Sequence, residues 1–438
     1  MTRMTHFEVS PGGRLSGRIQ VPGDKSISHR AIMLGALAEG ATEVDGFLEG
    51  EDTLATLAAF QAMGVGIEHP AAGCVRIHGV GLHGLRAPQG PLNLGNSGTS
   101  MRLLAGLLAG QAFDSELTGD ASLCQRPMRR VAAPLTEMGA VIKLQADGIP
   151  PLKIRGGQAL RGIDYALPMA SAQVKSCLLL AGLYARGRTC ITEPAPTRDH
   201  TERMLQGFGY VLDCSGRRIC IKGGGYLKSC CIQVPADISS AAFFMVGALL
   251  AGGSELTLKA VGVNPTRTGV IDILRLMGAD IELLNPHEEG GEPVADIRVR
   301  SSCLHGIEIP PRLVPLAIDE FPAIFIAAAC AEGETVLTGA RELRVKESDR
   351  IQVMADGLRK LGITALPAVD GMLIRGGQLH GGEVHSHGDH RVAMAYAIAA
   401  LRSTDTIRIR DCANVNTSFP GFVSLAQEVG LAIREQQG

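Results

Sequence analysis

The chain has 438 residues, of which 45% are hydrophobic and 20% are charged, the usage of ordinary globular proteins. One hydrophobic core rarely grows to this length, so we expect two domains. The formal net charge of −2 argues against a general attraction to nucleic acid or membranes, and no apolar run reaches the ~18 residues that cross a bilayer.

Two phrases each recur six times along the chain, at a spacing of roughly 70 to 85 residues. The first is a polar cluster that opens a helix rich in Ala, Leu and Gly, with copies beginning at Gly23, Gly95, Met169, Ala236, Ile318 and Gly388. The second ends an amphipathic helix at a glycine before a β-like stretch, with copies beginning at Gln61, Thr136, Leu205, Leu274, Leu358 and Ala426. Segments rich in Val, Ile and Thr are typical of strands and cover residues 74–80, 151–157, 220–225, 295–301 and 371–377.

This register predicts an α/β protein with six copies of a βαβαββ unit, three in each domain. The Ala- and Gly-rich helices are apolar nearly all round and should be buried, whereas the amphipathic helices should lie outside. The alternative is an ordinary doubly wound α/β enzyme whose glycine-rich turns look alike by chance.

Cations gather where the predicted helices begin. The polar starts contain Lys25, Ser26, Arg30, Asn96, Thr99, Arg102, Ser171, Gln173, Lys175, Asp319, Glu320, Asp389, His390 and Arg391, and the amphipathic helices begin with Arg126, with Arg198, and with Lys346, Glu347 and Arg350. Ser, Asp and Asn cap helices in any protein, but Lys and Arg are unfavourable at the positive end of a helix dipole unless an anion lies there. The pattern therefore predicts binding of phosphate or carboxylate groups.

The histidine run, the cysteines and the first residues of the chain could each indicate a special function, but a simpler interpretation of each is favoured. The run His385–His390 has the H-x-H-x-D-H spacing of a binuclear metal site, but no histidine follows His390 to complete it, so we expect no metal. Cys124 lies close to Arg126 and could be a nucleophile, although a plain free cysteine is the simpler explanation. The eleven cysteines show no paired zinc spacing, so we expect free thiols, and because the first residues contain no secretion signal we expect a cytoplasmic protein.

The polar clusters resemble the 5-enolpyruvylshikimate-3-phosphate synthase family of enolpyruvyl transferases. The resemblance runs from end to end, and its motifs span Val21–Arg30, Leu94–Arg102, Thr118–Asp120, Arg126–Met128, Ser171–Gln173, Arg198–Arg203, Leu343–Arg350, Asp389–Met394 and Thr417–Pro420. It implies a two-domain inverted α/β barrel that closes on substrate. We place one domain at residues 22–235 and the other at residues 1–21 plus 236–438, with the hinge near Pro22 and Pro235.

The resemblance also implies a reaction, in which the enolpyruvyl group of phosphoenolpyruvate moves to the 5-hydroxyl of shikimate 3-phosphate and phosphate leaves. Shikimate 3-phosphate would contact Lys25, Ser26, Arg30, Ser171, Ala172, Gln173, Thr197, Arg198, Asp319 and Lys346. Phosphoenolpyruvate would contact Lys25, Asn96, Gly98, Arg126, Gln173, Arg350 and Arg391. Asp319 resembles the family's base, and Glu347, with Lys25, would relay the proton to carbon. No metal or organic cofactor is implied, and we expect a monomer.

Two positions depart from the family pattern. Asn416 and Thr417 occupy the stretch where many members carry a lysine, so no lysine contact is expected there, and Glu342 stands where some members have Asn.

Two other functions stay open. One is the sister transferase that acts on UDP-N-acetylglucosamine and uses a loop cysteine. That cysteine lies further before its Arg-Pro pair than Cys124 lies before Arg126 and Pro127. The other is a six-repeat scaffold for nucleic-acid phosphates, which the near-neutral charge and the 4% of aromatic residues disfavour.

Overall fold

The computed structural model describes residues 5–437, so the first four residues of the predicted segment 1–21 and the last of 236–438 lie outside the described residues. The chain divides into two compact units. Unit 1 comprises the described parts of Met1–Pro22, Pro235–Glu288 and Glu292–Gly438, and unit 2 comprises Gly23–Val234 with Glu289–Gly291. Pro22 and Pro235 thus both belong to unit 1. Residues Glu289–Gly291 fall within the predicted segment 236–438 but belong to unit 2.

Unit 2 contains six α-helices and three sheets. Its helices are α1 Lys25–Leu37, α2 Glu51–Ala62, α3 Gly98–Ala109, α4 Arg129–Glu137, α5 Ala172–Gly182 and α6 His200–Gly207. The first sheet joins β14 (Leu227–Lys228), β3 (Ala38–Asp45), β5 (Cys74–Val80) and β4 (Gly66–Ala71), with β15 (Cys231–Gln233) also on β3. The second runs β6 (Leu92–Asn93), β7 (Ser115–Thr118), β9 (Leu152–Arg155) and β8 (Val141–Lys143), and the third runs β10 (Asp164–Ala166), β11 (Arg188–Thr192), β13 (Arg218–Lys222) and β12 (Leu212–Ser215).

The described part of unit 1 also contains six α-helices and three sheets. Its helices are α7 Ile238–Leu250, α8 Gly269–Leu276, α9 Phe321–Ala329, α10 Arg350–Lys360, α11 His390–Ala399 and α12 Phe422–Val429. One sheet runs β22 (Gly382–His385), β23 (Ile407–Arg410), β1 (Thr5–Val9) and β24 (Ile433–Gln437), and another runs β17 (Asp280–Glu289), β18 (Glu292–Arg300), β16 (Glu255–Gly262) and β2 (Ser16–Ile19). The third joins β19 (Glu334–Leu337), β21 (Gly371–Arg375) and β20 (Thr364–Ala368).

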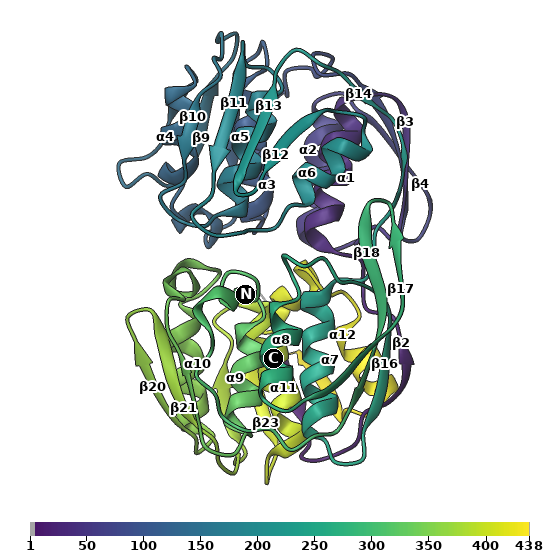
Figure 1. The fold of residues 1–438 in the computed structure, drawn as a ribbon, viewed down its shortest axis with the longest axis vertical. Helices are drawn as coiled ribbons and strands as arrows, with labels where there is room; N and C mark the ends of the chain where they lie inside the picture. The colour runs from purple at the N-terminus through teal and green to yellow at the C-terminus, as the bar shows by residue number, and fades with distance from the viewer. Residues whose placement is uncertain (1–4, 438) are drawn as a thin grey trace. The chain divides into compact units, whose positions relative to one another are not determined.

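The helix and strand predictions are confirmed at every repeated phrase. Each Ala- and Gly-rich helix is buried along nearly its whole length, as in α7 and α9, where every residue is buried, whereas α10 buries only one face. Within unit 1, α7, α9 and α11 pack against one another and lie side by side (Figure 1). Small residues permit this packing in both units: a Cβ on Gly106 of α3 would lie 2.0 Å from the carbonyl oxygen of Cys177 on α5.

The sheets share a pairing pattern. In β10-β11-β13-β12, β6-β7-β9-β8 and β22-β23-β1-β24, one parallel pair is followed by two antiparallel pairs. Each unit has its own buried apolar cluster formed by the inner helices and the inward faces of these strands. The same local topology therefore recurs in both units.

The expectation of free thiols is wrong for two cysteines. Cys190 and Cys220 form a disulfide, and the other nine are free. The two residues are directly opposite each other on the antiparallel strands β11 and β13. Their spacing of 30 residues matches no recognisable motif, because only the strand register brings them together.

Candidate functional site

In unit 2 the start of α1 carries the first predicted site residue. Asp24 caps this helix by accepting a hydrogen bond from the Ile27 N–H at 2.9 Å, which leaves Lys25 as the first helical residue. The Lys25 ammonium lies 2.9 Å from a carboxylate oxygen of Asp52 on α2, which is buried. An ammonium at the positive end of a helix is thus balanced in part by a neighbouring acid.

Arg30 lies one turn further along α1 and is only 4% exposed. Its Nε donates to the Thr201 hydroxyl at 2.7 Å, one Nη donates to the Ser176 hydroxyl at 2.8 Å, and the other donates to the carbonyl oxygen of Ser26 at 2.8 Å. These contacts fix the guanidinium between α1, α5 and α6. Ser176 and Thr201 were not among the predicted site residues, although both lie in or beside quoted motifs.

His29, between these two cations, is fully buried among hydroxyl groups. Its Nδ1 lies 2.8 Å from the Thr56 hydroxyl. Burial lowers the pKa of His29 well below its usual value, and the positive charges of Lys25 and Arg30 lower it further. The imidazole is therefore held neutral in a positive environment. Sequence reasoning missed this residue because a histidine inside a buried helix gives no distinctive signal.

The start of α3 gathers two arginines around Gly98. Arg126 donates to the carbonyl oxygen of Asn96 at 3.1 Å and to its side-chain oxygen at 2.5 Å, and the Asn96 amide donates to Asp120 at 2.7 Å. A Cβ added to Gly98 would lie 3.0 Å from an Nη atom of Arg102 and 3.2 Å from an Nη atom of Arg126. Gly98 therefore lets both guanidinium groups approach the first turn of the helix.

Gln173 joins α5 to this group. Its side-chain oxygen accepts from Arg102 at 2.6 Å, and its amide nitrogen donates to the Thr99 hydroxyl at 3.1 Å. The structure thus brings together Asn96, Gly98, Arg126 and Gln173, all predicted to contact one substrate, and adds Arg102. Ser171 caps α5 by accepting from the Val174 N–H at 3.4 Å, so its hydroxyl already has a structural partner, and Ala172 is the first residue of the helix.

Thr197 lies on the loop before α6, in a buried charged group. Its hydroxyl donates to Glu193, whose carboxylate also lies 3.1 Å from the ammonium of Lys175. Lys175 is 1% exposed and forms a second ion pair, 2.7 Å long, with Glu202. Burial raises the pKa of Glu193, although the Lys175 charge opposes this effect. Arg198, half-buried, follows Thr197 on the same loop.

In unit 1 the predicted residues converge on one buried guanidinium. Arg350, the first residue of α10, lies 2.8 Å from Asp389, 3.3 Å from Asp319 and 2.5 Å from Glu347, measured from guanidinium nitrogen to carboxylate oxygen. Burial opposes its charge, but the three carboxylates, Asp389 foremost, outweigh that effect and raise the pKa of Arg350. Arg350 is therefore a permanent cation enclosed by acids.

The neighbouring cations contact the same acids. The Lys346 ammonium lies 3.0 Å from an Asp319 carboxylate oxygen, and one Nη of Arg391 donates to the Asp319 backbone oxygen at 3.2 Å. Asp389 caps α11 by accepting from the Arg391 N–H at 3.0 Å. The structure thus brings together Asp319, Lys346, Glu347, Arg350 and Arg391, and adds Asp389.

The histidine run does not form a ligand cluster. Asp389 is turned toward Arg350, while the rings of His385 and His387 pair with their centroids 4.4 Å apart. Among residues 5–437, no group of three or more His, Cys, Asp or Glu side chains is placed to hold a metal ion. Over the same residues, no helix is both long and apolar enough to span a membrane.

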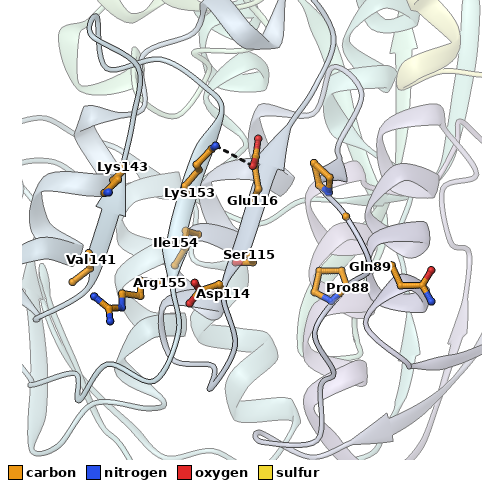
Figure 2. Close-up of a pocket in the computed structure, with 12 residues that line it drawn as sticks. Pro88, Gln89, Asp114, Ser115, Glu116, Val141, Lys143, Lys153, Ile154 and Arg155 are labelled. Atoms are coloured by element: carbon orange, nitrogen blue, oxygen red, sulfur yellow. Dashed lines mark ion pairs between the residues drawn. The ribbon is translucent and has the colours of Figure 1, made fainter.

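A cavity of about 490 Å³ in unit 2 lies apart from these clusters (Figure 2). It is formed by the outer face of β7, β9 and β8 and by the segment Pro88–Pro91, and it includes an ion pair of 3.5 Å between Lys153 and Glu116. None of the predicted site residues lines it. The cavity is therefore not the predicted substrate site, and the contacts described above define the candidate site better than the cavity does.

Fold comparison first defines a class. The crystal structure of the enolpyruvyl transferase NikO from Streptomyces tendae matches with a TM-score of 0.79 over 100% of both chains, at 17% identity. At this identity the match shows the fold alone. The chain thus has the α/β fold of an enolpyruvyl transferase.

Closer matches identify the family. The family model described as EPSP synthase (3-phosphoshikimate 1-carboxyvinyltransferase) matches residues 9–425. A 3-phosphoshikimate 1-carboxyvinyltransferase of Alkalilimnicola ehrlichii is 71% identical over 98% of this chain and 96% of its own. The structure of EPSP synthase from Acinetobacter baumannii is 59% identical, with a TM-score of 0.88 over 99% of this chain and 100% of that one. The chain belongs to the EPSP synthase family of enzymes.

Proposed function

We infer that this chain transfers the enolpyruvyl group of phosphoenolpyruvate to the 5-hydroxyl of shikimate 3-phosphate and releases phosphate. The reaction belongs to the shikimate pathway of aromatic amino-acid biosynthesis. The observation that carries the inference is the 71% identity to a named 3-phosphoshikimate 1-carboxyvinyltransferase over nearly the full length of both chains. The two anionic substrates also match the cationic helix starts.

We propose that unit 2 supplies most of the anion contacts. Asn96, Gly98, Arg126 and Gln173 would bind phosphoenolpyruvate. Their support is the convergence of guanidinium groups on the first turn of α3, where backbone N–H groups also attract anions. Shikimate 3-phosphate would contact residues at and after the helix starts, namely Lys25, Ser26, Arg30, Ser171, Ala172, Gln173, Thr197 and Arg198.

We propose that unit 1 supplies the proton-transfer groups. Asp319 would take the proton of the 5-hydroxyl, and Glu347, with Lys25, would deliver a proton to the methylene carbon. Their support is the contact of both carboxylates with Arg350, which holds the two groups close together in unit 1. Arg350 and Arg391 would also contact phosphoenolpyruvate, and Lys346 would contact shikimate 3-phosphate.

We also propose the finer architecture, a two-domain inverted α/β barrel with three βαβαββ units in each domain. It is supported by the alternation of buried and amphipathic helices and by the recurring pairing pattern of the sheets. The domain segments 22–235 and 1–21 plus 236–438 correspond closely to the two units. Closure around substrate, the cytoplasmic location and the monomeric state stay predictions.

The test is phosphate release when purified protein is mixed with phosphoenolpyruvate and shikimate 3-phosphate. We expect multiple turnovers with both substrates and none when either is omitted. Addition of a chelator should leave the rate unchanged, because no step requires a metal. UDP-N-acetylglucosamine in place of shikimate 3-phosphate should give no release, and turnover with that acceptor alone would identify the sister reaction instead.

A further inference from the structure

Cys190 and Cys220 occupy the centre of the sheet β10-β11-β13-β12. They are opposite each other on β11 and β13, with their Cα atoms 4.1 Å apart. Asp164 on β10 lies beside Cys190, and Asp213 on β12 lies beside Cys220. One row across the four strands therefore reads Asp, Cys, Cys, Asp.

This row lies on the outer face of the sheet. Side chains alternate along a strand, and the neighbours Ile191, Ile219 and Ile221 belong to the buried core of unit 2, whereas neither cysteine does. Both cysteines are nevertheless only 6% and 4% exposed. Something on the outer face must therefore cover the sulfur atoms.

Two crossed ion pairs lie on this face of the sheet and are the candidate cover. Arg188 on β11 reaches across β13 to Asp213, and Arg218 on β13 reaches across β11 to Asp164 at 2.6 Å. Given the strand register, the two arginine side chains pass on opposite sides of the cysteine pair. All four charged side chains are between 48% and 65% exposed, and exposed ion pairs of this kind are weak, so the cover can open readily.

We propose that Cys190 and Cys220 form a reversible redox site, a dithiol that low-molecular-weight disulfides close and thiols reopen. In the closing reaction one cysteine thiolate attacks a small disulfide RSSR, forming a mixed disulfide and releasing RS⁻. The second cysteine thiolate then attacks the protein sulfur of that mixed disulfide and releases another RS⁻. The two protons lost by the cysteines protonate these anions, so two RSH molecules form and the protein loses two electrons to RSSR.

The surroundings suit this chemistry. Exchange proceeds through the thiolate, which neighbouring cations favour. Arg188, Arg218 and Lys222 lie on the same face, each two residues along its strand from a cysteine, while Asp164 and Asp213 stand directly beside the cysteines. Cys214, on β12 of the same sheet, is exposed but has no cysteine opposite it, since its ladder partner is Ile219. Cys214 is therefore a matched control, a thiol on the same sheet that has no cysteine opposite it with which to form a disulfide.

The cross-link also lies next to the loop that we propose binds the substrate phosphate. Glu193 follows β11 directly, and its N–H donates to the backbone oxygen of Arg217, which precedes β13. The same Glu193 carboxylate accepts from Thr197. The Cys190–Cys220 disulfide links β11 and β13 three residues from the Glu193–Arg217 hydrogen bond. Closing the disulfide should therefore restrain the loop and tighten phosphate binding, a consequence that rests on the proposed function.

The first experiment needs no substrate, so it is independent of the proposed function. Purified full-length protein is equilibrated in glutathione buffers of increasing oxidation, quenched by acid, alkylated and analysed by peptide mass spectrometry. We expect a Cys190–Cys220 peptide that interconverts completely between dithiol and disulfide and is restored by dithiothreitol. Cys214→Ser should behave like wild type, and Cys190→Ser should stop at a mixed disulfide on Cys220. A pair that stays reduced, or stays oxidised, at every buffer ratio overturns the proposal.

The second experiment measures the consequence for the loop. Binding of shikimate 3-phosphate is titrated calorimetrically with the wild type in its two redox states and with the Cys190→Ser variant as the permanently open form. We expect the closed form to bind about threefold more tightly, within the range for coupling through contiguous contacts. Equal affinities in the two states would remove the link to the loop. If shikimate 3-phosphate binds neither state, the proposed function fails while the exchange result stands.

Discussion

The starts of α1 in unit 2 and α10 in unit 1 lie in electrostatic surroundings of opposite sign. At α1, the charges of Lys25 and Arg30 join burial in lowering the pKa of His29. At α10, three carboxylates outweigh burial and raise the pKa of Arg350. Acids lie at both starts, because Asp52 pairs with Lys25 at α1, whereas three carboxylates surround the single guanidinium of Arg350 at α10. The two helix starts therefore differ in how fully the protein itself balances the cations.

The difference limits the charge argument made from the sequence. A cation at the positive end of a helix needs a compensating anion, and at Arg350 the protein supplies it through Asp319, Glu347 and Asp389. Arg30 instead donates to two hydroxyl groups and a carbonyl oxygen. We propose that unit 2 chiefly binds substrate and that unit 1 chiefly transfers protons, and the variants below test this division.

The largest effect is expected from removing the proton-transfer groups. Asp319→Asn and Glu347→Gln should each lower kcat by about 100- to 10,000-fold while substrates still bind, because general acid–base catalysis contributes on that order. Steady-state kinetics and calorimetric binding measure the two effects separately. Glu334→Gln, which removes an exposed acid paired with Arg375, is the control and should keep wild-type kcat. Wild-type kcat in either site variant would exclude that carboxylate from the mechanism.

The next effect concerns stability in unit 1. Arg350→Met leaves three carboxylates without the cation they share, and breaking a buried ion pair from one side costs about 3 to 5 kcal/mol. Urea denaturation should show this loss in the free energy of unfolding. Arg359→Met removes an exposed pair with Asp356 at the other end of the same helix and should cost about 1 kcal/mol or less. Equal losses in the two variants would show that the acids do not depend on Arg350.

A smaller effect tests the positive environment in unit 2. The folded-state pKa of His29 is below its unfolded value of 6.5, so the unfolded chain binds the proton more readily. This contribution to stability is therefore present above the unfolded pKa and is lost as the pH falls below it. His29→Asn removes the titrating group, so its unfolding free energy should fall less over the same range. Identical pH dependence in the wild type and the variant would contradict a neutral His29.

The sequence predicted well whatever depends on local pattern. Ala- and Gly-rich phrases located the buried helices, and glycine stops located the ends of the amphipathic ones. Helix starts were less accurate: Arg126 lies three residues before α4, in extended conformation, because Pro127 disfavours the helical region for the residue before it. Partners distant in sequence could not be predicted. Arg30 meets Ser176 and Thr201 at separations of 146 and 171 residues, which only helix packing brings together.

Cys124 should have the smallest effect of the residues considered. Its thiol is half-buried and donates to the backbone oxygen of Gly119 at 3.4 Å, and the thiol also lies 3.9 Å from the Thr118 hydroxyl. A serine hydroxyl can form the same hydrogen bonds, so Cys124→Ser should leave turnover close to that of the wild type. Loss of turnover, together with a covalent adduct on Cys124 in the wild type, would instead assign a nucleophile to unit 2. The division between anion binding in one unit and proton transfer in the other would then fail.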